Sequence, residues 1–304
     1  MWHVRLMRTA AVLALLTLVP AALPLANDAP ADVQANPVTP LSAVLVQRRL
    51  SYDLDAVRRG EDMVPAVFER RLPGWLPAIE DTRERKETFL KLVLPIVLEA
   101  NSRIHARRLK LLEISWLVRN GIALPPVSQA WLETTARDYK VDLAADGGLD
   151  ELLRRVDIVP ASLALAQAIT ESGWGSSRFA QKGNALFGQR IWSQGGGIVP
   201  KARASEETFE VRAFRSLSQS VREYMRNLNT HDAYADLRAL RADLRRTEGR
   251  VDGYELAAGL TSYAETGDEY VEVLRTIMQA NSLQDFETAR IEGTRLPSLA
   301  FRAY

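Results

Sequence analysis

A chargeless, apolar segment that ends in a single carboxylate is the feature that most constrains this chain. Residues 159–169 (Val-Pro-Ala-Ser-Leu-Ala-Leu-Ala-Gln-Ala-Ile) are followed directly by Thr170 and Glu171. Pro160 suits a first helical turn and Gly173 suits a helix end, so the pattern predicts an apolar helix with Glu171 in its last turn. The helix dipole disfavours an anion at that end by roughly 0.3–1 kcal/mol.

The surroundings of Glu171 predict a raised pKa. Its helical neighbours three and four residues away are Gln167, Ala168, Trp174 and Gly175, none of which is a cation. A carboxyl group with apolar and aromatic neighbours and no local cation keeps its proton to higher pH. Such a group suits general acid catalysis, which makes Glu171 the first candidate for a catalytic residue. The alternative for an arbitrary Glu is a surface side chain in a fraying last turn.

The motifs after Glu171 resemble those of a known domain. They are, in order, Glu171-Ser-Gly-Trp-Gly-Ser-Ser, Asn184-Ala-Leu-Phe-Gly188, Phe209-Glu-Val-Arg-Ala-Phe-Arg-Ser216 and Tyr263-Ala264. The set is similar to the glucosaminidase domain of glycoside hydrolase family 73 and covers about residues 150–283. Residues 89–101 and 152–160 resemble the bacterial Bax family, which is unrelated to the animal apoptosis protein. In that family the domain follows a helical N-terminal region.

The resemblance implies both a fold and an activity. The expected fold is mainly α, with a lysozyme-like α+β glucosaminidase lobe that carries a small β-hairpin, preceded by a helical N-terminal region. The expected activity is hydrolysis of peptidoglycan at the β-1,4 bond after N-acetylglucosamine (GlcNAc) in the glycan of GlcNAc and N-acetylmuramic acid (MurNAc), with Glu171 as general acid. Two alternatives stay open: cleavage of the other linkage by a lysozyme or lytic transglycosylase, and a non-catalytic cell-wall-binding protein.

Further catalytic candidates also come from the resemblance. The family places a second carboxylate on the hairpin, where this chain offers Glu206 and Glu207 almost equally, with Glu210 third. This hairpin is shorter than is typical of the family. If none of the three acts, the N-acetyl group of the substrate serves as internal nucleophile. Tyr263 matches the tyrosine that the family places beside the catalytic glutamate.

Four residues are expected to bind substrate: Trp174, Asn184, Phe187 and Gly188. The two aromatic side chains suit sugar stacking or an apolar wall around the carboxyl, and Trp192, beside a Gly-rich loop, is a weaker candidate. Gly188 is expected for its backbone geometry. Aromatic residues in a helical domain more often pack in the core, and this alternative applies to Tyr263 as well.

Composition limits the class of function. The formal net charge of the 304 residues is +1, so nothing indicates a nucleic-acid partner. The absence of Cys excludes disulfides, thiolate metal sites, thiol nucleophiles and a lipoprotein anchor. Three scattered His residues do not form a His-rich metal site. The sequence therefore implies no metal and no other cofactor. The family resemblance implies a peptidoglycan glycan strand as the partner.

The N-terminus predicts where the protein goes. A basic lead over residues 1–8 precedes a chargeless run over residues 10–26, which is typical of a secretory signal peptide. Residues 1–26 are therefore expected to be a signal peptide, or else an uncleaved anchor, which Pro20 and Pro24 make less attractive. We expect an exported protein, periplasmic or associated with the cell envelope. A basic stretch over residues 103–110 leaves peripheral membrane or cell-wall association open.

The remaining chain divides into four segments. Residues 27–41 are polar and Pro-rich and predict a flexible leader, and residues 42–145 predict the helical N-terminal region. Within that region residues 82–119 are strongly helical, and Pro95 is expected to kink or split the helix. Alternation of apolar and charged residues over residues 208–214 indicates a small β-hairpin in the domain at residues 150–283. Residues 284–304 are expected to form a tail. Further helices are expected at residues 42–60, 127–140, 217–231, 254–260 and 268–281.

Overall fold

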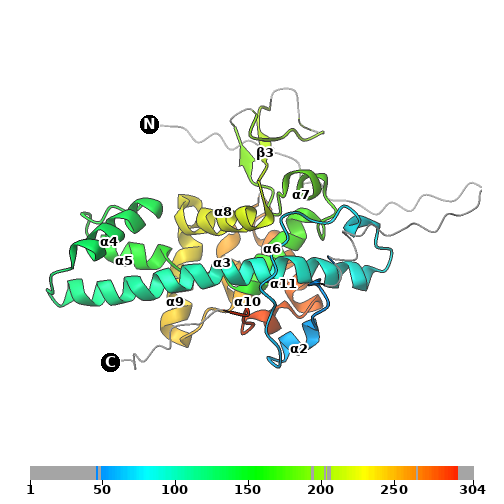
Figure 1. The fold of residues 1–304 in the computed structure, drawn as a ribbon. Helices are drawn as coiled ribbons and strands as arrows, with labels where there is room; N and C mark the ends of the chain where they lie inside the picture. The colour runs from blue at the N-terminus through cyan, green and yellow to red at the C-terminus, as the bar shows by residue number, and fades with distance from the viewer. Residues whose placement is uncertain are drawn as a thin grey trace, which may run out of the picture.

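The computed structural model describes residues 46, 49–192, 195–201, 203, 207–264 and 266–293. The expected signal peptide, the leader and Glu206 lie outside the described residues. The described chain is mainly helical with one small antiparallel sheet (Figure 1), which confirms the predicted fold class. None of the described helices combines the length and hydropathy that a membrane span requires.

A long helix, α3 (Thr82–Arg119), runs along the molecule (Figure 1). It begins at Asp81, whose carboxylate accepts a hydrogen bond from the backbone N–H of Glu84 at 2.7 Å. Its first half is buried from Phe89 to Ala100, apart from a few half-buried positions, and packs against α6 (Ala161–Ser172) and α8 (Leu217–Thr230). The helix therefore joins the N-terminal region to the domain that follows it.

Pro95 lies inside α3, yet the helix is continuous, so the expected split does not occur. A proline cannot donate a backbone hydrogen bond to the carbonyl four residues earlier, which here belongs to Lys91. The hydroxyl of Tyr52 donates to this Lys91 carbonyl at 3.2 Å. The N-terminal segment thus supplies the donor that the proline lacks.

Helix α6 forms the centre of the core, and it begins after Pro160 and ends at Gly173 as predicted. At its start, the carboxylate of Glu287 accepts hydrogen bonds from the backbone N–H groups of Ala161 (3.1 Å) and Ser162 (3.4 Å). Leu283 and Phe286 of the short helix η4 (Leu283–Phe286) are fully buried in the same core. The part of the expected tail that the structure describes, residues 284–293, is therefore packed into the fold.

The other helices complete the helical body. Those that the sequence predicted are α2 (Leu54–Arg58), α4 (Pro126–Asp138), α8, α10 (Gly253–Leu256) with η3 (Ala257–Leu260), and α11 (Asp268–Ala280). The remaining ones are η1 (Leu76–Ala78), α5 (Gly148–Arg155), α7 (Arg178–Gly183), η2 (Asp232–Tyr234) and α9 (Ala235–Glu248). Helix α9 was not predicted because its buried face includes Arg238 and Arg241, which hide its hydrophobic period.

One hydrophobic core extends across the expected boundary between the N-terminal region and the domain. Phe89 and Ile96 of α3 belong to the same cluster of buried side chains as Leu165, Leu228 and Phe286. A second, smaller cluster holds the end of α3 together with α4 and α5. The limits 42–145 and 150–283 thus stay a division predicted from sequence.

A three-stranded antiparallel sheet projects from the helical body (Figure 1). Its central strand is β3 (Glu210–Arg212), which lies between β1 (Arg190–Ile191) and β2 (Gly197–Ile198). Val211 is opposite Arg190 on one side and Ile198 on the other. The alternation predicted at residues 208–214 is confirmed as β3. The expected hairpin is part of this small sheet.

Candidate active site

Glu171 lies in the last turn of α6, and its side chain is half-buried. The hydroxyl of Tyr270 on α11 donates a hydrogen bond to Glu171 Oε1 at 2.9 Å. Burial raises the pKa of Glu171, and the hydrogen bond from Tyr270 and the charge of Arg190 only partly oppose this. The raised pKa expected from the sequence is therefore found in the structure.

A chain of hydrogen bonds fixes the direction in which Tyr270 donates. Gln167, one turn before Glu171 on α6, donates from Nε2 to the Tyr270 hydroxyl at 3.1 Å. Tyr224 of α8 donates to Gln167 Oε1 at 2.5 Å. Burial raises the pKa of Tyr270 far above its usual range, so the hydroxyl keeps its proton. Because its oxygen accepts from Gln167, that proton is directed to Glu171.

This network was not predicted from the sequence. No local pattern links Tyr224 or Tyr270 to Glu171, and Tyr270 is 99 positions away from it. The one available signal was Gln167, a polar residue in an otherwise apolar run, four positions before Glu171 on the same helix face.

The motif after Glu171 folds the chain back toward the N-terminal region. Ser172 Oγ donates to the carbonyl of Ala168 at 2.6 Å and accepts from the N–H of Gly175 at 2.9 Å. Gly175 has a φ of 76°, and a Cβ there would lie 2.9 Å from Leu72 Cδ1 and 3.0 Å from Phe89 Cδ2. Glycine suits this position because its backbone comes so close to these side chains at a positive φ. The motif therefore packs the end of α6 against Phe89 of α3.

The two aromatic candidates are both packed against other rings. Trp174 makes an edge contact with Phe89, with ring centroids 5.8 Å apart, and Lys86 Nζ lies 5.0 Å from the Trp174 ring centroid. Phe187 is buried and stacks on Tyr224 with centroids 3.8 Å apart. These contacts favour core packing for Phe187 and a docking contact with α3 for Trp174. Their role in sugar binding stays a prediction.

The segment at Gly188 lies directly against the catalytic candidate. Gly188 has a φ of 58°, and a Cβ there would lie 3.3 Å from Glu171 Oε2. Tyr263 donates from its hydroxyl to the Phe187 carbonyl at 3.2 Å. Its ring stacks on Tyr270 with centroids 5.2 Å apart and an angle of 7°. Tyr263 thus contacts both the backbone before Gly188 and the ring of Tyr270, the two groups that lie against Glu171.

Asn184 has a structural contact at the edge of the site. It ends α7 with a φ of 52°, is buried, and donates from Nδ2 to the carbonyl of Phe214 at 2.9 Å. This hydrogen bond joins the segment between α7 and Gly188 to the segment that follows β3. A contact of Asn184 with substrate stays a prediction.

The hairpin carboxylates have different surroundings. Glu210 is buried and accepts from the backbone N–H groups of Gly195 (3.1 Å) and Gly197 (2.8 Å), so it stabilises the sheet. Glu207 is half-buried on the segment that leads into β3. Phe209 on the same segment packs under Arg190, at 4.4 Å from the guanidinium carbon to the ring centroid. Arg190 thus contacts this segment, and its charge also acts on Glu171.

Trp192 lies at the end of β1, and its side chain is 71% exposed. Its neighbours on the Gly-rich loop, residues 193 and 194, lie outside the described residues. The side chain is therefore free of core packing, and the weaker expectation that it stacks on sugar stays a prediction.

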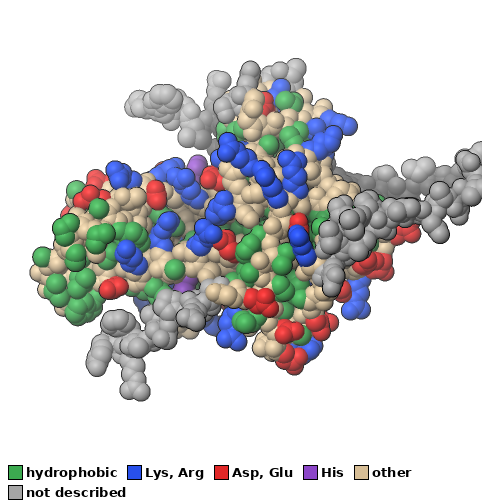
Figure 2. Space-filling view, in the orientation of Figure 1, with side chains coloured by type: hydrophobic (Ala, Val, Ile, Leu, Met, Phe, Trp, Pro, Cys, Tyr) green, Lys and Arg blue, Asp and Glu red, His purple; other side chains and the backbone are tan. Residues whose placement is uncertain are grey.

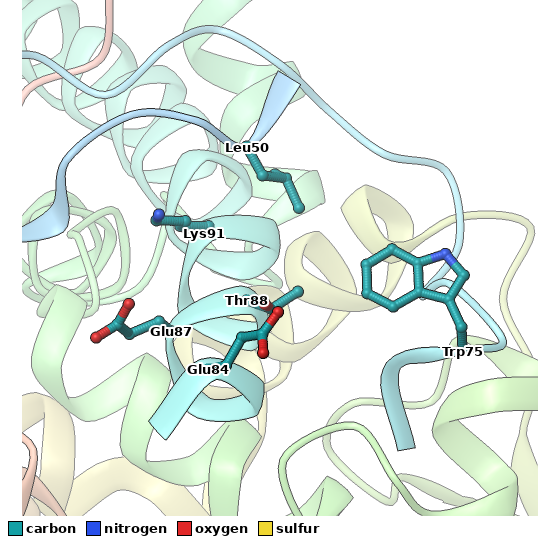
Figure 3. Close-up of a pocket in the computed structure, with 6 residues that line it drawn as sticks. All are labelled: Leu50, Trp75, Glu84, Glu87, Thr88 and Lys91. Atoms are coloured by element: carbon teal, nitrogen blue, oxygen red, sulfur yellow. The ribbon is translucent and has the colours of Figure 1, made fainter. Parts of the chain in front are cut away.

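A separate pocket of about 150 Å³ lies between the N-terminal segment and the start of α3 (Figure 3). Its lining residues are Leu50, Trp75, Glu84, Glu87, Thr88 and Lys91. Glu87 is already paired with Arg83 at 2.8 Å. No residue predicted for the active site lines this pocket, so it is distinct from the Glu171 site.

The comparisons with known proteins agree with this arrangement. A helical lobe with a half-buried glutamate at a helix end, beside a small sheet, is what the motifs predict for a glucosaminidase domain. The Glucosaminidase family model, described as "Mannosyl-glycoprotein endo-beta-N-acetylglucosaminidase", matches residues 148–283. The chain is 33% identical over 205 residues to "Protein bax" of Escherichia coli (strain K12), across 65% of this chain and 70% of that protein. No solved structure matches the chain. The chain belongs to the family of Bax-like proteins with a glucosaminidase domain.

Proposed function

We propose that this protein is an exported peptidoglycan hydrolase that cleaves the β-1,4 bond after GlcNAc in the GlcNAc–MurNAc glycan. The observation that carries the proposal is the half-buried Glu171 at the end of α6, with its raised pKa and its hydrogen bond from Tyr270, in a domain of the glucosaminidase family. Cleavage of a glycosidic bond requires a proton for the leaving oxygen. A carboxyl group that keeps its proton toward neutral pH can supply it.

The neighbours of Glu171 suit both of its protonation states. Before proton transfer, burial favours the neutral acid. After transfer, the hydrogen bond from Tyr270 and the charge of Arg190 stabilise the carboxylate. The opposing effects keep the pKa raised without preventing donation, which general acid catalysis requires.

The second catalytic group is proposed to be Glu207 or Glu206, on the segment that Arg190 contacts. A carboxylate across the cleft would activate a water or stabilise the oxocarbenium-like transition state. The alternative is substrate assistance by the N-acetyl group, which needs neither carboxylate.

Glutamine substitutions separate these mechanisms. We expect either Glu206→Gln or Glu207→Gln to lower the rate of sacculus hydrolysis by about 10²-fold or more, because one general base or stabilising charge is lost. The other variant should retain most of its activity and serves as the matched control. Near wild-type rates for both variants would instead support substrate assistance.

Tyr270→Phe is expected to shift the pH dependence of hydrolysis. The hydrogen bond from Tyr270 favours ionised Glu171, so its removal raises the pKa of Glu171 further. The alkaline limb of the rate profile, where the acid loses its proton, then moves to higher pH, and the maximal rate falls roughly tenfold because the carboxyl loses its orientation. The control is Tyr254→Phe, whose exposed hydroxyl contacts only Gln279 among the described hydrogen bonds. An unchanged or downward-shifted alkaline limb contradicts the assignment.

Product analysis tests the linkage. Residues 27–304 contain every described residue, so this chain can be incubated with purified sacculi and the fragments analysed by mass spectrometry after reduction. GlcNAc at the new reducing end supports the proposal. MurNAc there would assign a lysozyme, and anhydro-MurNAc a lytic transglycosylase. Sedimentation of the protein with sacculi without fragment release would assign a non-catalytic cell-wall-binding protein.

A further inference from the structure

The end of α3 that lies away from the active site forms an arm with α4 and α5 (Figure 1). We define the arm as residues 103–156. Leu111 and Ile114 on the inner face of α3 are buried in a cluster with Leu132, Tyr139 and Leu152. The arm therefore has its own small core, and side chains on its outer face are not needed to complete it.

The tip of this arm exposes large apolar side chains. Half of the ten exposed large hydrophobic residues in the described chain lie between residues 112 and 127. They are Leu112 (43% exposed), Trp116 (57%), Val118 (42%), Ile122 (45%) and Val127 (75%). Figure 2 shows hydrophobic side chains gathered at this end of the molecule. Residues 114–132 contain a single charged side chain, Arg119. Such a concentration marks a contact surface rather than ordinary scatter.

The arm behind the tip is basic. Its α3 part, residues 103–119, contains five Lys and Arg against one Glu, and the whole arm, residues 103–156, contains nine Lys and Arg against seven Asp and Glu, a net charge of +2. The exposed cations are Arg103, Arg107, Lys110, Arg119, Arg137 and Lys140. Positive charge beside an exposed apolar tip fits an anionic partner.

We propose that the tip of the arm binds the surface of an anionic phospholipid membrane. Trp and aliphatic side chains would enter the boundary between headgroups and acyl chains, as they do in interfacial segments. The exposed cations would lie near the lipid phosphates, where each Lys or Arg adds attraction. A second copy of this chain fits less well, because two arms that each carry a net charge of +2 would repel each other at a symmetric contact.

Vesicle sedimentation tests the proposal on residues 27–304, which lack the apolar N-terminal run that would itself bind lipid. The probe is phosphatidylcholine vesicles with and without about a third phosphatidylglycerol. We expect wild-type protein to bind the anionic vesicles and Trp116→Ser/Ile122→Ser/Val127→Ser to bind at least about tenfold more weakly. The control, Met63→Ser/Phe68→Ser/Val273→Ser, removes three exposed apolar side chains elsewhere (47%, 43% and 45% exposed) and should bind like wild type.

Several results would overturn the assignment. Absence of wild-type binding to anionic vesicles, or equal binding by the tip variant, excludes the tip as the lipid contact. A wild-type dimer in analytical ultracentrifugation that the tip variant cannot form, without vesicle binding, assigns the tip to a second copy. Circular dichroism and thermal unfolding show whether the tip variant is folded, and a single Trp116→Ser variant provides a milder change if it is not. Binding that persists in high salt would contradict the role of the cations, since exposed charges are screened there.

Discussion

Glu171→Gln is expected to lower the rate of sacculus hydrolysis by about 10²–10⁴-fold, the usual contribution of a general acid. Glutamine keeps the size of the side chain and can still accept the hydrogen bond from Tyr270, but it has no proton of suitable acidity for the leaving oxygen. The measurement is the initial rate at which soluble fragments are released from purified sacculi by residues 27–304. Glu255→Gln, on an exposed position of α10, is the matched control and should retain full activity.

A stability measurement excludes the trivial explanation of unfolding. Burial raises the pKa of Glu171 in the folded state, so its contribution to stability is complete below the ordinary glutamate range and is lost as pH rises through the raised pKa. Gln does not ionise. The variant should therefore be at least as stable as wild type at neutral pH. Activity within about tenfold of wild type would contradict the assignment of Glu171 as the acid. Loss of folding would contradict the expected stability of the variant.

Asp157→Asn is expected to cost about 3–5 kcal/mol of the free energy of unfolding, the cost of leaving buried cations unpaired. Asp157 is 2% exposed. It accepts from Arg245 Nε at 2.8 Å and Nη2 at 2.6 Å, and Arg108 Nη1 lies 3.4 Å from its Oδ2. The fully buried Arg241 has its Nε 4.0 Å away. The group connects α3, α9 and the entry to α6, so its loss affects the whole core.

Urea unfolding of wild type and variant measures this cost. Burial opposes ionisation of Asp157, but the charges of Arg241, Arg108 and Arg245 outweigh it and lower the pKa. The carboxylate therefore stabilises the fold above the ordinary aspartate range, and this stabilisation is lost as pH falls through the lowered pKa. The difference from wild type should shrink accordingly in acid. Asp243→Asn, which removes an exposed ion pair with Arg246 on the same α9, should cost less than about 1 kcal/mol. Equal effects of the two substitutions would contradict a structural role for the buried cluster.

Local sequence signals predicted the parts of the fold that local physics determines. The apolar run after Pro160 and the glycine at 173 located α6 and placed Glu171 at its end. Alternation at residues 208–214 located β3. Both features depend on neighbours within a few residues, so a single sequence contains them.

Contacts between distant segments could not be predicted in the same way. Tyr52 donates to a carbonyl 39 residues later, and Glu287 caps a helix that begins 126 residues earlier. Helix α9 was not predicted because an arginine is usually a surface residue. Nothing local in the sequence shows that Arg241 is buried against Asp157 and the carbonyl of Ile158. Phe187 matched a family motif, but the sequence did not reveal that Tyr224 covers its ring.

The most direct test of the account is a titration of the Glu171 carboxyl carbon by ¹³C nuclear magnetic resonance. The signal can be assigned in protein with labelled glutamate because it is absent from the Glu171→Gln variant. The structure predicts a midpoint clearly above the ordinary glutamate value of about 4.3, since burial outweighs Tyr270 and Arg190. The titration should coincide with the alkaline limb of the hydrolysis rate. A midpoint at or below the ordinary value would mean that Glu171 is ionised at neutral pH and cannot be the proton donor.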